Sequence, residues 1–449
     1  MKIKIIILFI ISLHAFLLSK LIFFPYPELF VYPYLVKNGF LPYKQIFDQH
    51  LPSLLMSHFN FYDLGLRTPE SARLFLIGSV TLTHFLLYFV HKKVSGKASI
   101  LPIFIYLVVQ PLFEGYILWL DTFLAPILLL GFYFSYKVIH ERKDVDAILA
   151  GLFLGLAIFF KQMMIPLSVV SIVYIYLKTK SRKIAAIATL TALIPLFLSL
   201  AWILSKGIFN EFFYWTFIFN FEIYSRMAVK MPTLSQVVRV LLWYIPSIYV
   251  ILKNLGKINF KLIAMFLLLP LADVIARFEF VHLQPTIPFV ALLSAMFFSS
   301  KFKLKRVFSI AMIFVIAIWL FRFYETNING KTYFFDSETI ETSQKVSNLT
   351  VENDRIFILG TQPIVYPLSG RLPAGNLFTV NLPWNMKVAQ RSILDGLKKD
   401  NPKIVVRDKE ASIDGQKIVD FSSDINSFIN SNYVKIDQIG NNEILKLKK

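Results

Sequence analysis

Long apolar stretches separated by short basic connections fill the first three-quarters of the chain. A transmembrane helix needs roughly 20 mostly apolar residues, within a range of about 17–25. The pattern predicts about eleven spans, several of them short, near residues 5–24, 73–91, 98–113, 117–136, 147–160, 162–177, 184–205, 236–252, 262–275, 283–300 and 307–321. The pair 147–160 and 162–177 forms either two crossings or a re-entrant hairpin around Lys161, and both interpretations return the chain to the same side. We therefore predict an α-helical polytopic membrane protein.

The composition agrees with this interpretation. Of the 449 residues, 56% are hydrophobic and only 17% are charged, whereas soluble domains are about 45–50% apolar and about 25% charged. The chain has no cysteine, which excludes disulfides, thiolate zinc sites and cysteine nucleophiles. The first span is too long for the apolar region of a signal peptide, and no small-residue cleavage site follows it. We therefore expect an uncleaved membrane anchor.

The net charge of +19 comes mainly from every second connection between the predicted spans. These connections contain Lys2 and Lys4; Lys92, Lys93 and Lys97; Lys137, Arg142 and Lys143; Lys178, Lys180, Arg182 and Lys183; Lys253, Lys257 and Lys261; and Lys301, Lys303, Lys305 and Arg306. Because cytoplasmic loops carry an excess of Lys and Arg, we expect the N-terminus to be cytoplasmic and the residues after about 322 to lie outside the plasma membrane. This distribution explains the basic balance without a nucleic-acid partner.

We expect residues 1–325 to form the membrane domain and to include two long outer segments. The first, about 25–72, is too long for a simple turn. The second, about 206–235, is rich in Phe, Tyr and Trp, which suits a helix lying at the membrane interface.

The polar C-terminal portion, 331–449, has a different pattern. Short apolar runs at 355–360 and 403–408 have the length of buried strands. They alternate with helical patterns near 337–350 and 386–399. This alternation predicts a small extracytoplasmic α/β domain.

Ionisable and polar side chains gather on the predicted outer side, beside the ends of the spans. Such groups are costly in or near a bilayer and are candidates for function. A carboxylate can accept a proton from an attacking hydroxyl, and Lys, Arg or protonated His can neutralise charge on a departing phosphate. Both are needed when a sugar moves from a lipid phosphate to an alcohol, and single displacement requires one base. The candidates are Glu28, Asp48, His50, Glu114, Asp121, Lys161, Gln162, Arg277 and His282, with Asp273 and Glu279 nearby.

Simpler interpretations stay open for several of these residues. Glu28 could favour the positive N-terminus of a short helix. Lys161 could extend its ammonium towards the interface, and Asp121 could cap the fourth span. His14, alone in the first span, is more typical of a packing residue. The aromatic residues at 212–224 suit interface anchoring better than a platform for a sugar.

The first outer loop, PELFVYPYLVKNGFLPYKQIFDQHLP, resembles that of GT-C membrane glycosyltransferases that use polyprenyl-phosphate sugars. Protein O-mannosyltransferases and the lipid A aminoarabinose transferase belong to this group. In their pattern an acidic residue follows the first span, an amphipathic helix leads to G-x-x-P-Y, and a polar pair precedes a proline. Here Glu28, residues 38–43 and residues 48–52 fill these positions. Looser matches lie at 117–134, 153–170, 277–290 and 355–375.

The resemblance implies roles for several candidates. Glu28 would be the catalytic base, and Asp48 would orient the acceptor or hold a divalent cation, so that metal dependence stays open. Lys161, Arg277, His282 and His50 would hold the lipid-linked phosphate.

We include Glu114, Asp121 and Gln162 among the substrate-binding candidates and assign no metal ligand. The chain departs from the family pattern at Leu29, where many members carry a second acid, and at Gln49-His50, where some have Lys.

The leading hypothesis is an inverting glycosyltransferase that moves a sugar from a polyprenyl-phosphate donor to a glycan, lipid or protein acceptor. A lipid-linked saccharide flippase or transporter is an alternative, but it should place polar groups along a path through the whole bilayer. A glycan polymerase or ligase is another, and it predicts dominant Arg and His in a late loop without a base after the first span.

Overall fold

A computed structural model describes residues 2–299 and 305–448. The chain forms two compact units, each made of separate stretches of sequence. The helical unit contains Met1–Phe24, Glu70–Leu198 and Lys230–Lys331. The mixed unit contains Pro25–Pro69, Ser199–Val229 and Thr332–Lys449. The predicted division into a catalytic domain, 1–325, and an outer domain, 331–449, stays a prediction.

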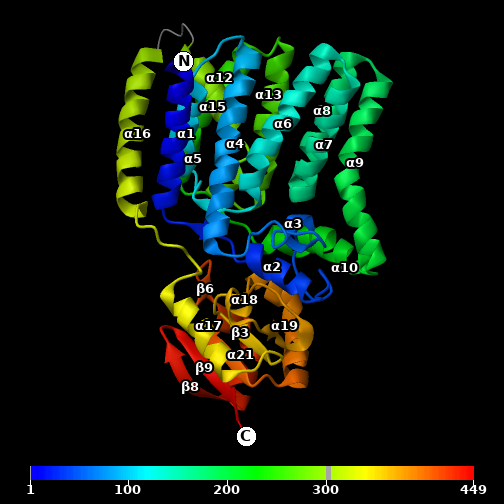
Figure 1. The fold of residues 1–449 in the computed structure, drawn as a ribbon, viewed down its shortest axis with the longest axis vertical. Coiled ribbons are helices and arrows are strands. Elements are labelled where there is room, and N and C mark those ends of the chain that lie inside the picture. Colours follow the sequence, from blue (N-terminus) through cyan, green and yellow to red (C-terminus); the bar gives the residue numbers. More distant parts are fainter. Residues whose placement is uncertain (1, 300–304, 449) are drawn as a thin grey trace. The chain divides into compact units, whose positions relative to one another are not determined.

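Long apolar helices make up the helical unit, and most of them run side by side in Figure 1. They are α1 (Lys2–Lys20), α4 (Pro69–Ser95), α5 (Leu101–Leu112), α6 (Leu120–Glu141), α7 (Asp144–Phe160), α8 (Ile165–Thr179), α9 (Arg182–Ser205), α12 (Leu234–Lys253), α13 (Ile258–Leu268), α15 (Ile287–Ser299) and α16 (Lys305–Asn327). Each predicted span overlaps one of these helices. The predicted pair around Lys161 forms two helices, α7 and α8.

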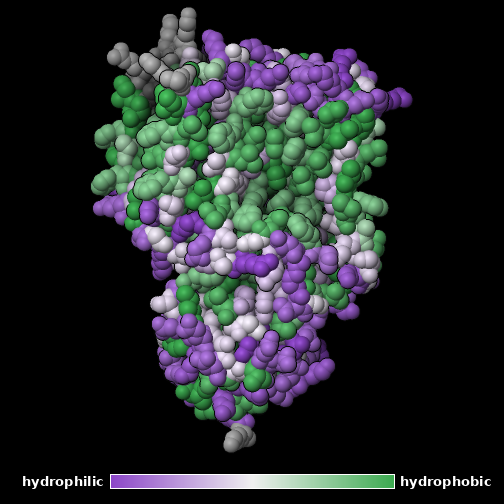
Figure 2. Space-filling model, in the orientation of Figure 1, coloured by the Kyte–Doolittle hydropathy of each residue, from purple (hydrophilic) through white to green (hydrophobic). Residues whose placement is uncertain are grey.

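Seven helical segments in the described part of the chain are long and apolar enough to cross a membrane. Two shorter apolar helices, α5 and α15, accompany them. Large apolar side chains such as Phe197 and Phe314 are 68% exposed, and Figure 2 shows hydrophobic residues covering the sides of these helices. A soluble protein does not expose such a surface, so the chain is an integral membrane protein, as predicted. The predicted cytoplasmic cations Lys301 and Lys303 lie outside the described residues.

A glycine pair brings α7 and α9 into close contact. A Cβ atom on Gly151 would lie 2.2 Å from the Ala188 carbonyl oxygen, and one on Gly155 would lie 2.1 Å from that of Ala192. Small residues four apart let two helix backbones approach in this way. The packing fixes the position of α7, whose C-terminal end presents Lys161.

The mixed unit begins with the first outer segment, which contains α2 (Glu28–Lys37) and α3 (Ser53–Met56). Gly39 follows α2 with φ +85°, a conformation that glycine adopts at helix C-termini. The aromatic-rich segment at about 206–235 contains α10 (Phe209–Phe213), the π-helical turns η2 (Tyr214–Ile218) and η3 (Asn220–Tyr224), and α11 (Ser225–Met227). Its predicted placement at the membrane interface stays a prediction.

A five-stranded sheet with the order β4-β3-β5-β9-β8 lies at the centre of the C-terminal region. The strands are β3 (Arg355–Leu359), β4 (Leu372–Pro373), β5 (Ile404–Asp408), β8 (Tyr433–Ile439) and β9 (Asn442–Leu447). β3 pairs in parallel with β4 and β5, whereas β9 pairs antiparallel with β5 and β8.

Helices complete this α/β region, namely α17 (Ser337–Leu349), α18 (Val365–Ser369), α19 (Pro383–Asp400), α20 (Ile418–Phe421) and α21 (Ser423–Asn432). Phe357, Val405 and Leu445 of the sheet share an apolar core with Met386 of α19 and Ile425 of α21. The strands and helices predicted in this region are confirmed.

Candidate active site

Lys161 lies at the centre of a buried ionic cluster in the helical unit. α7 ends at Phe160, and the extended backbone of Lys161 (φ −154°) starts the turn towards α8. The Lys161 Nζ atom donates to both Asp121 carboxylate oxygens at 2.9 and 2.8 Å. It also lies 2.5 Å from Asp273 Oδ2. Because the Lys161 and Asp121 side chains are 6% and 0% exposed, these charges compensate one another away from solvent.

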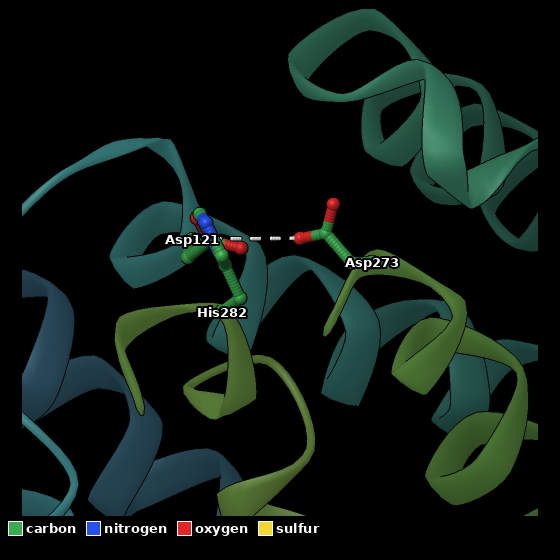
Figure 3. A group of neighbouring side chains, drawn as sticks. All are labelled: Asp121, Asp273 and His282. Carbon is green, nitrogen blue, oxygen red and sulfur yellow. Dashed lines mark hydrogen bonds and ion pairs between the residues drawn. The ribbon is translucent and has the colours of Figure 1, made fainter. Parts of the chain in front are cut away.

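His282 completes this group, which we call the lysine cluster (Asp121, Lys161, Asp273 and His282). Its Nδ1 lies 3.0 Å from Asp121 Oδ2 and 3.1 Å from Lys161 Nζ. Figure 3 shows Asp121 and His282 beside each other, with Asp273 reaching towards them from another element. Asp121 lies in the first turn of α6, Asp273 begins α14 (Asp273–Ala276), and His282 lies in η5 (Phe280–Leu283).

The lysine cluster has the donor set of a cation site. One ligand atom from each of Asp121, Asp273 and His282 lies within 4.8 Å of the others, and carboxylates with imidazole suit several divalent metals. Here, however, the Lys161 ammonium lies between the two carboxylates and supplies their positive charge. A cation can bind this triad only when that ammonium moves away or loses its proton.

Glu279 holds a second group of charges beside His282. Its Oε1 accepts from Arg277 Nε at 2.9 Å and from Lys230 Nζ at 3.3 Å, and its Oε2 lies 3.9 Å from His282 Nε2. Lys230 and Arg277 also form a β-bridge, which brings the two cations to the same carboxylate. Two cations therefore face one carboxylate beside His282.

Glu114 lies between α5 and α6, where its Oε2 accepts from the Val281 backbone N–H at 3.1 Å. Burial raises the pKa of the Glu114 carboxyl, although the Val281 hydrogen bond opposes the shift. The hydrogen bond ties this turn to the residue that precedes His282. Gln162, also predicted as a site residue, begins the short helix η1 (Gln162–Met164) directly after Lys161.

A second polar group, the first-loop cluster (Glu28, Tyr32, Asp48 and His50), lies in the mixed unit. Asp48 is 3% exposed and accepts hydrogen bonds on both carboxylate oxygens. The Tyr32 hydroxyl donates to Oδ2 at 2.7 Å. The His50 backbone N–H donates to Oδ1 at 2.7 Å, and His50 Nδ1 lies 2.8 Å from the same atom. Burial would raise the pKa of Asp48, but the His50 charge and these hydrogen bonds hold it below its usual value.

Glu28 differs from Asp48 in its surroundings. It is the first residue of α2, and its buried Oε2 atom has no hydrogen-bond partner. Burial raises the pKa of the Glu28 carboxyl to about 7, and the nearby Asp48 charge acts in the same direction. Two carboxyls of one loop therefore have pKa values shifted in opposite directions, which is typical of acid–base sites.

Backbone contacts hold the loop around Asp48 in place. The Tyr43 hydroxyl donates to the His50 carbonyl at 2.9 Å, and Asn220 of the aromatic helical stretch donates to the Gln49 carbonyl at 3.0 Å. Tyr43 itself has φ +64°, a strained conformation for a residue with a side chain. These contacts fix the direction in which the first-loop cluster presents its carboxyls.

The structure brings the predicted residues together in two groups. Asp121, Lys161 and His282 share the lysine cluster, and Glu28, Asp48 and His50 occur in the first-loop cluster. Sequence reasoning gave no role to Tyr32 or Lys230. Tyr32 follows Glu28 by four residues on one helix and so lies on the same face, a signal that could have identified it. Lys230 reaches Glu279 from 49 residues away in the chain, and no local pattern indicates that contact.

Comparisons with known proteins identify the fold. No known family profile and no curated protein matches the sequence, but solved structures resemble the fold closely. ArnT from Cupriavidus metallidurans bound to undecaprenyl phosphate is similar at a TM-score of 0.68 and 11% identity, over 98% of this chain and 97% of that one. The structure without the ligand gives a TM-score of 0.66 and 10% identity, over 98% and 97% of the two chains.

The archaeal oligosaccharyltransferase AglB from Archaeoglobus fulgidus is also similar. Its complex with an inhibitory peptide and a dolichol-phosphate gives a TM-score of 0.50 at 12% identity, over 91% of this chain and 70% of that one. The Archaeoglobus fulgidus oligosaccharyltransferase in complex with Zn and sulfate gives a TM-score of 0.52 at 11% identity, over 89% of this chain and 68% of that one. The chain therefore has the same fold as ArnT and AglB, as the sequence resemblance implied.

Proposed function

We propose that this protein is a GT-C membrane glycosyltransferase that takes a sugar from a polyprenyl phosphate and transfers it to an acceptor hydroxyl. Three observations support the proposal: the GT-C fold over nearly the whole chain, the motif of the first outer loop, and the contrasting carboxyls of Glu28 and Asp48. The ArnT structure with undecaprenyl phosphate and the AglB structure with dolichol-phosphate support a polyprenyl-phosphate carrier. The acceptor is a glycan, a lipid or a protein.

The observation that carries the proposal is the buried, unpartnered carboxylate oxygen of Glu28. A general base works best when its pKa lies near the working pH, and the pKa of Glu28 is raised to about 7. An oxygen without a protein partner has its lone pairs available for the acceptor hydroxyl. Glu28 then removes the proton of the acceptor hydroxyl while the oxygen of that hydroxyl attacks the anomeric carbon of the donor sugar. The sugar–phosphate bond breaks on the opposite face, so the anomeric configuration is inverted.

Asp48 has a different role in this mechanism. Its carboxylate stays charged at neutral pH, because its pKa is held low and both oxygens accept hydrogen bonds. A fixed carboxylate can orient the acceptor by accepting a hydrogen bond from a second hydroxyl. Its charge also favours the protonated form of Glu28 and so increases the basicity of that carboxylate.

The departing lipid phosphate needs positive charge but no strong general acid, because a phosphate is a good leaving group. Arg277 and Lys230 provide that charge in the helical unit, and His282 adds to it when its imidazole is protonated. Arg277 is the best suited of them, since a guanidinium can bind a phosphate through two nitrogens at once. A direct phosphate contact by Lys161 remains part of the proposal, although its ammonium is compensated by two carboxylates in this structure.

The positive-inside distribution supports an orientation with a cytoplasmic N-terminus and extracytoplasmic residues after about 322. The chain has no cysteine, so single cysteines can be introduced without a background signal. A cysteine at Ser347 should react with a membrane-impermeant maleimide in intact cells, and one at Lys178 should react only after the cells are lysed. The opposite pattern would reverse the proposed orientation.

Mass spectrometry of lipid-linked sugars tests the function itself. Cells that lack this protein should accumulate one polyprenyl-phosphate sugar, and expression of the wild type should remove the excess while Glu28→Gln should not. The Glu28→Gln protein must be present in the membrane in normal amount, which immunoblotting measures. An unchanged set of lipid-linked sugars in cells that lack the protein would refute the proposed donor class.

A further inference from the structure

A cavity of about 270 Å³ lies in the C-terminal α/β region, and the residues that line it belong to neither of the clusters described above. Half-buried Gln362, Asn381 and Asp408 contribute polar groups to it, and half-buried Pro363, Val380 and Ile413 contribute apolar surface. The proposed transfer mechanism assigns no role to any of these residues.

The position of this cavity in the sheet is one at which α/β proteins bind ligands. Gly360 and Thr361 directly follow β3, and Asp408 is the last residue of β5, so the cavity lies at the carboxyl ends of two parallel strands. β3 is also where the strand order reverses, because β4 follows on one side of it and β5 on the other. Crevices at such a point are the usual ligand sites of open α/β sheets.

The loops that form the cavity are held together by close contacts. Gly360 has φ +77°, and a Cβ atom there would lie 2.4 Å from the Asp408 carbonyl oxygen. The Gly360 N–H donates to Asn381 Oδ1 at 3.1 Å. Asp408 Oδ1 accepts from the backbone N–H groups of Glu410 and Ala411 at 2.8 and 3.1 Å. The loops that contain Gly360, Asn381 and Asp408 are therefore ordered before any ligand binds, which lowers the entropic cost of binding.

The charge of the lining limits the class of ligand. No Lys, Arg or His lines the cavity within the described residues, and the one carboxyl group among the lining residues is that of Asp408. Burial raises the pKa of that carboxyl, which indicates that the cavity disfavours negative charge. A phosphate, a nucleotide or a lipid-phosphate headgroup would find no cation to pair with. The ligand must be neutral or carry a positive charge.

The remaining lining suits a ring with polar groups around its edge and an apolar face. Amide and carboxyl groups of Gln362, Asn381 and Asp408 can donate to and accept from several hydroxyls, and the side chains of Val380 and Ile413 can cover an apolar ring face. The volume of about 270 Å³ is just below the roughly 300–1,000 Å³ of pockets that hold drug-sized ligands. It therefore accommodates one ring rather than a chain of several.

We infer that this cavity is a binding site for one neutral sugar residue, through which the C-terminal region holds a saccharide-containing acceptor. The assignment to the acceptor rests on the proposed function, whereas the sugar site itself rests on the cavity. When one sugar of the acceptor is bound here, the rest of the acceptor lies outside the cavity. The site would then select acceptors by a sugar that is not the one receiving the transferred group.

Saturation-transfer NMR on the full-length Glu28→Gln protein in nanodiscs tests the site without turnover. The probes are neutral hexoses and pentoses, together with the 1-phosphates of the same sugars. At least one neutral sugar should bind, and its 1-phosphate should bind at least tenfold more weakly. Val380→Trp should fill the cavity and weaken binding at least tenfold. Leu368→Trp, on the exposed face of α18 and outside the lining, should leave binding unchanged.

Gln362→Met provides a second variant in case Val380→Trp does not fold, because it keeps the side-chain volume and removes the amide. It should weaken sugar binding about tenfold, as expected for the loss of a hydrogen bond worth about 1.4 kcal/mol. The inference is overturned if no neutral sugar binds, if both lining variants bind like Leu368→Trp, or if the 1-phosphate binds more tightly. If the sugar binds as expected but the wild type transfers no sugar, the cavity assignment stands and the proposed function fails.

Discussion

Replacement of Lys161 by alanine tests the physical organisation of the lysine cluster. The change removes the ammonium that pairs with Asp121 at 2.8 Å and Asp273 at 2.5 Å. Both carboxylates are then left without their cation, and Asp121 is fully buried. Removal of one partner from a buried ion pair destabilises a protein by about 3–5 kcal/mol. We therefore expect Lys161→Ala to lower the apparent melting temperature of the purified protein by several degrees.

The chain offers a matched control at Lys183, which pairs with Asp144 at 2.5 Å. The two side chains are 71% and 47% exposed, and such surface pairs contribute about 1 kcal/mol or less. Lys183→Ala should melt within about one degree of the wild type, as measured by tryptophan fluorescence in the same detergent. Equal melting temperatures for the two variants would contradict the assignment of Lys161 as the charge-compensating cation.

Lys161→Ala should also convert the lysine cluster into a metal site, because the ligand atoms of Asp121, Asp273 and His282 lie within 4.8 Å of one another. Manganese at 100 times its dissociation constant would stabilise the variant by about 2.7 kcal/mol, recovering much of the loss. The wild type should respond much less, since its ammonium occupies the position between the carboxylates. An equal manganese response in both proteins would refute the view that Lys161 replaces a divalent cation.

Four further predictions concern the first-loop cluster and Arg277. Sugar transfer should increase as the pH rises through about 7 and then level off, because the Glu28 carboxyl with its raised pKa must lose its proton to act as a base; a flat kcat/KM profile between pH 5.5 and 8.5 would contradict this role. The stability that protonated Glu28 contributes should be complete below pH 4.5 and should be lost as the pH rises through about 7. Glu28→Gln should therefore have the melting temperature of the wild type at pH 5 and a higher melting temperature than the wild type at pH 8. Arg277→Ala should raise the KM for the lipid donor about tenfold or more with a smaller effect on kcat, and the same KM in both proteins would exclude a phosphate contact. Tyr32→Phe should destabilise the protein by about 1–3 kcal/mol through loss of the bond to Asp48, and denaturant unfolding measures that difference.

Much of the helical unit could be predicted from the sequence, because a bilayer imposes a simple rule on length and polarity. Each predicted span overlaps a helix, although their ends differ. The first span was predicted at 5–24, whereas α1 is Lys2–Lys20, since the apolar residues 21–24 continue the apolar run without continuing the helix. The strands and helices of the C-terminal region were also predictable, because a short continuous apolar run and the 3.6-residue period of a helix are local signals.

The ionic contacts could not be predicted in the same way. The pairing of Lys161 with Asp121 joins residues 40 apart in the chain, and the pairing with Asp273 depends on where α14 begins. Lys161 was therefore assigned to the substrate phosphate from its charge, its position beside a span and the resemblance, and its compensation by two carboxylates became visible only in the folded chain. The opposite pKa shifts of Glu28 and Asp48 likewise depend on burial and hydrogen bonds that spacing does not indicate.

The most direct test of the central claim is single-turnover transfer by purified Glu28→Gln, supplied with the polyprenyl-phosphate sugar that accumulates in cells without the protein. Glutamine keeps the size of the side chain and cannot accept the hydroxyl proton, so release of polyprenyl phosphate should fall by at least about 100-fold, the lower range for loss of a general base. Binding of the donor should stay within a factor of two of the wild type. Transfer at the wild-type rate would contradict the account, because Glu28 would then not be the base.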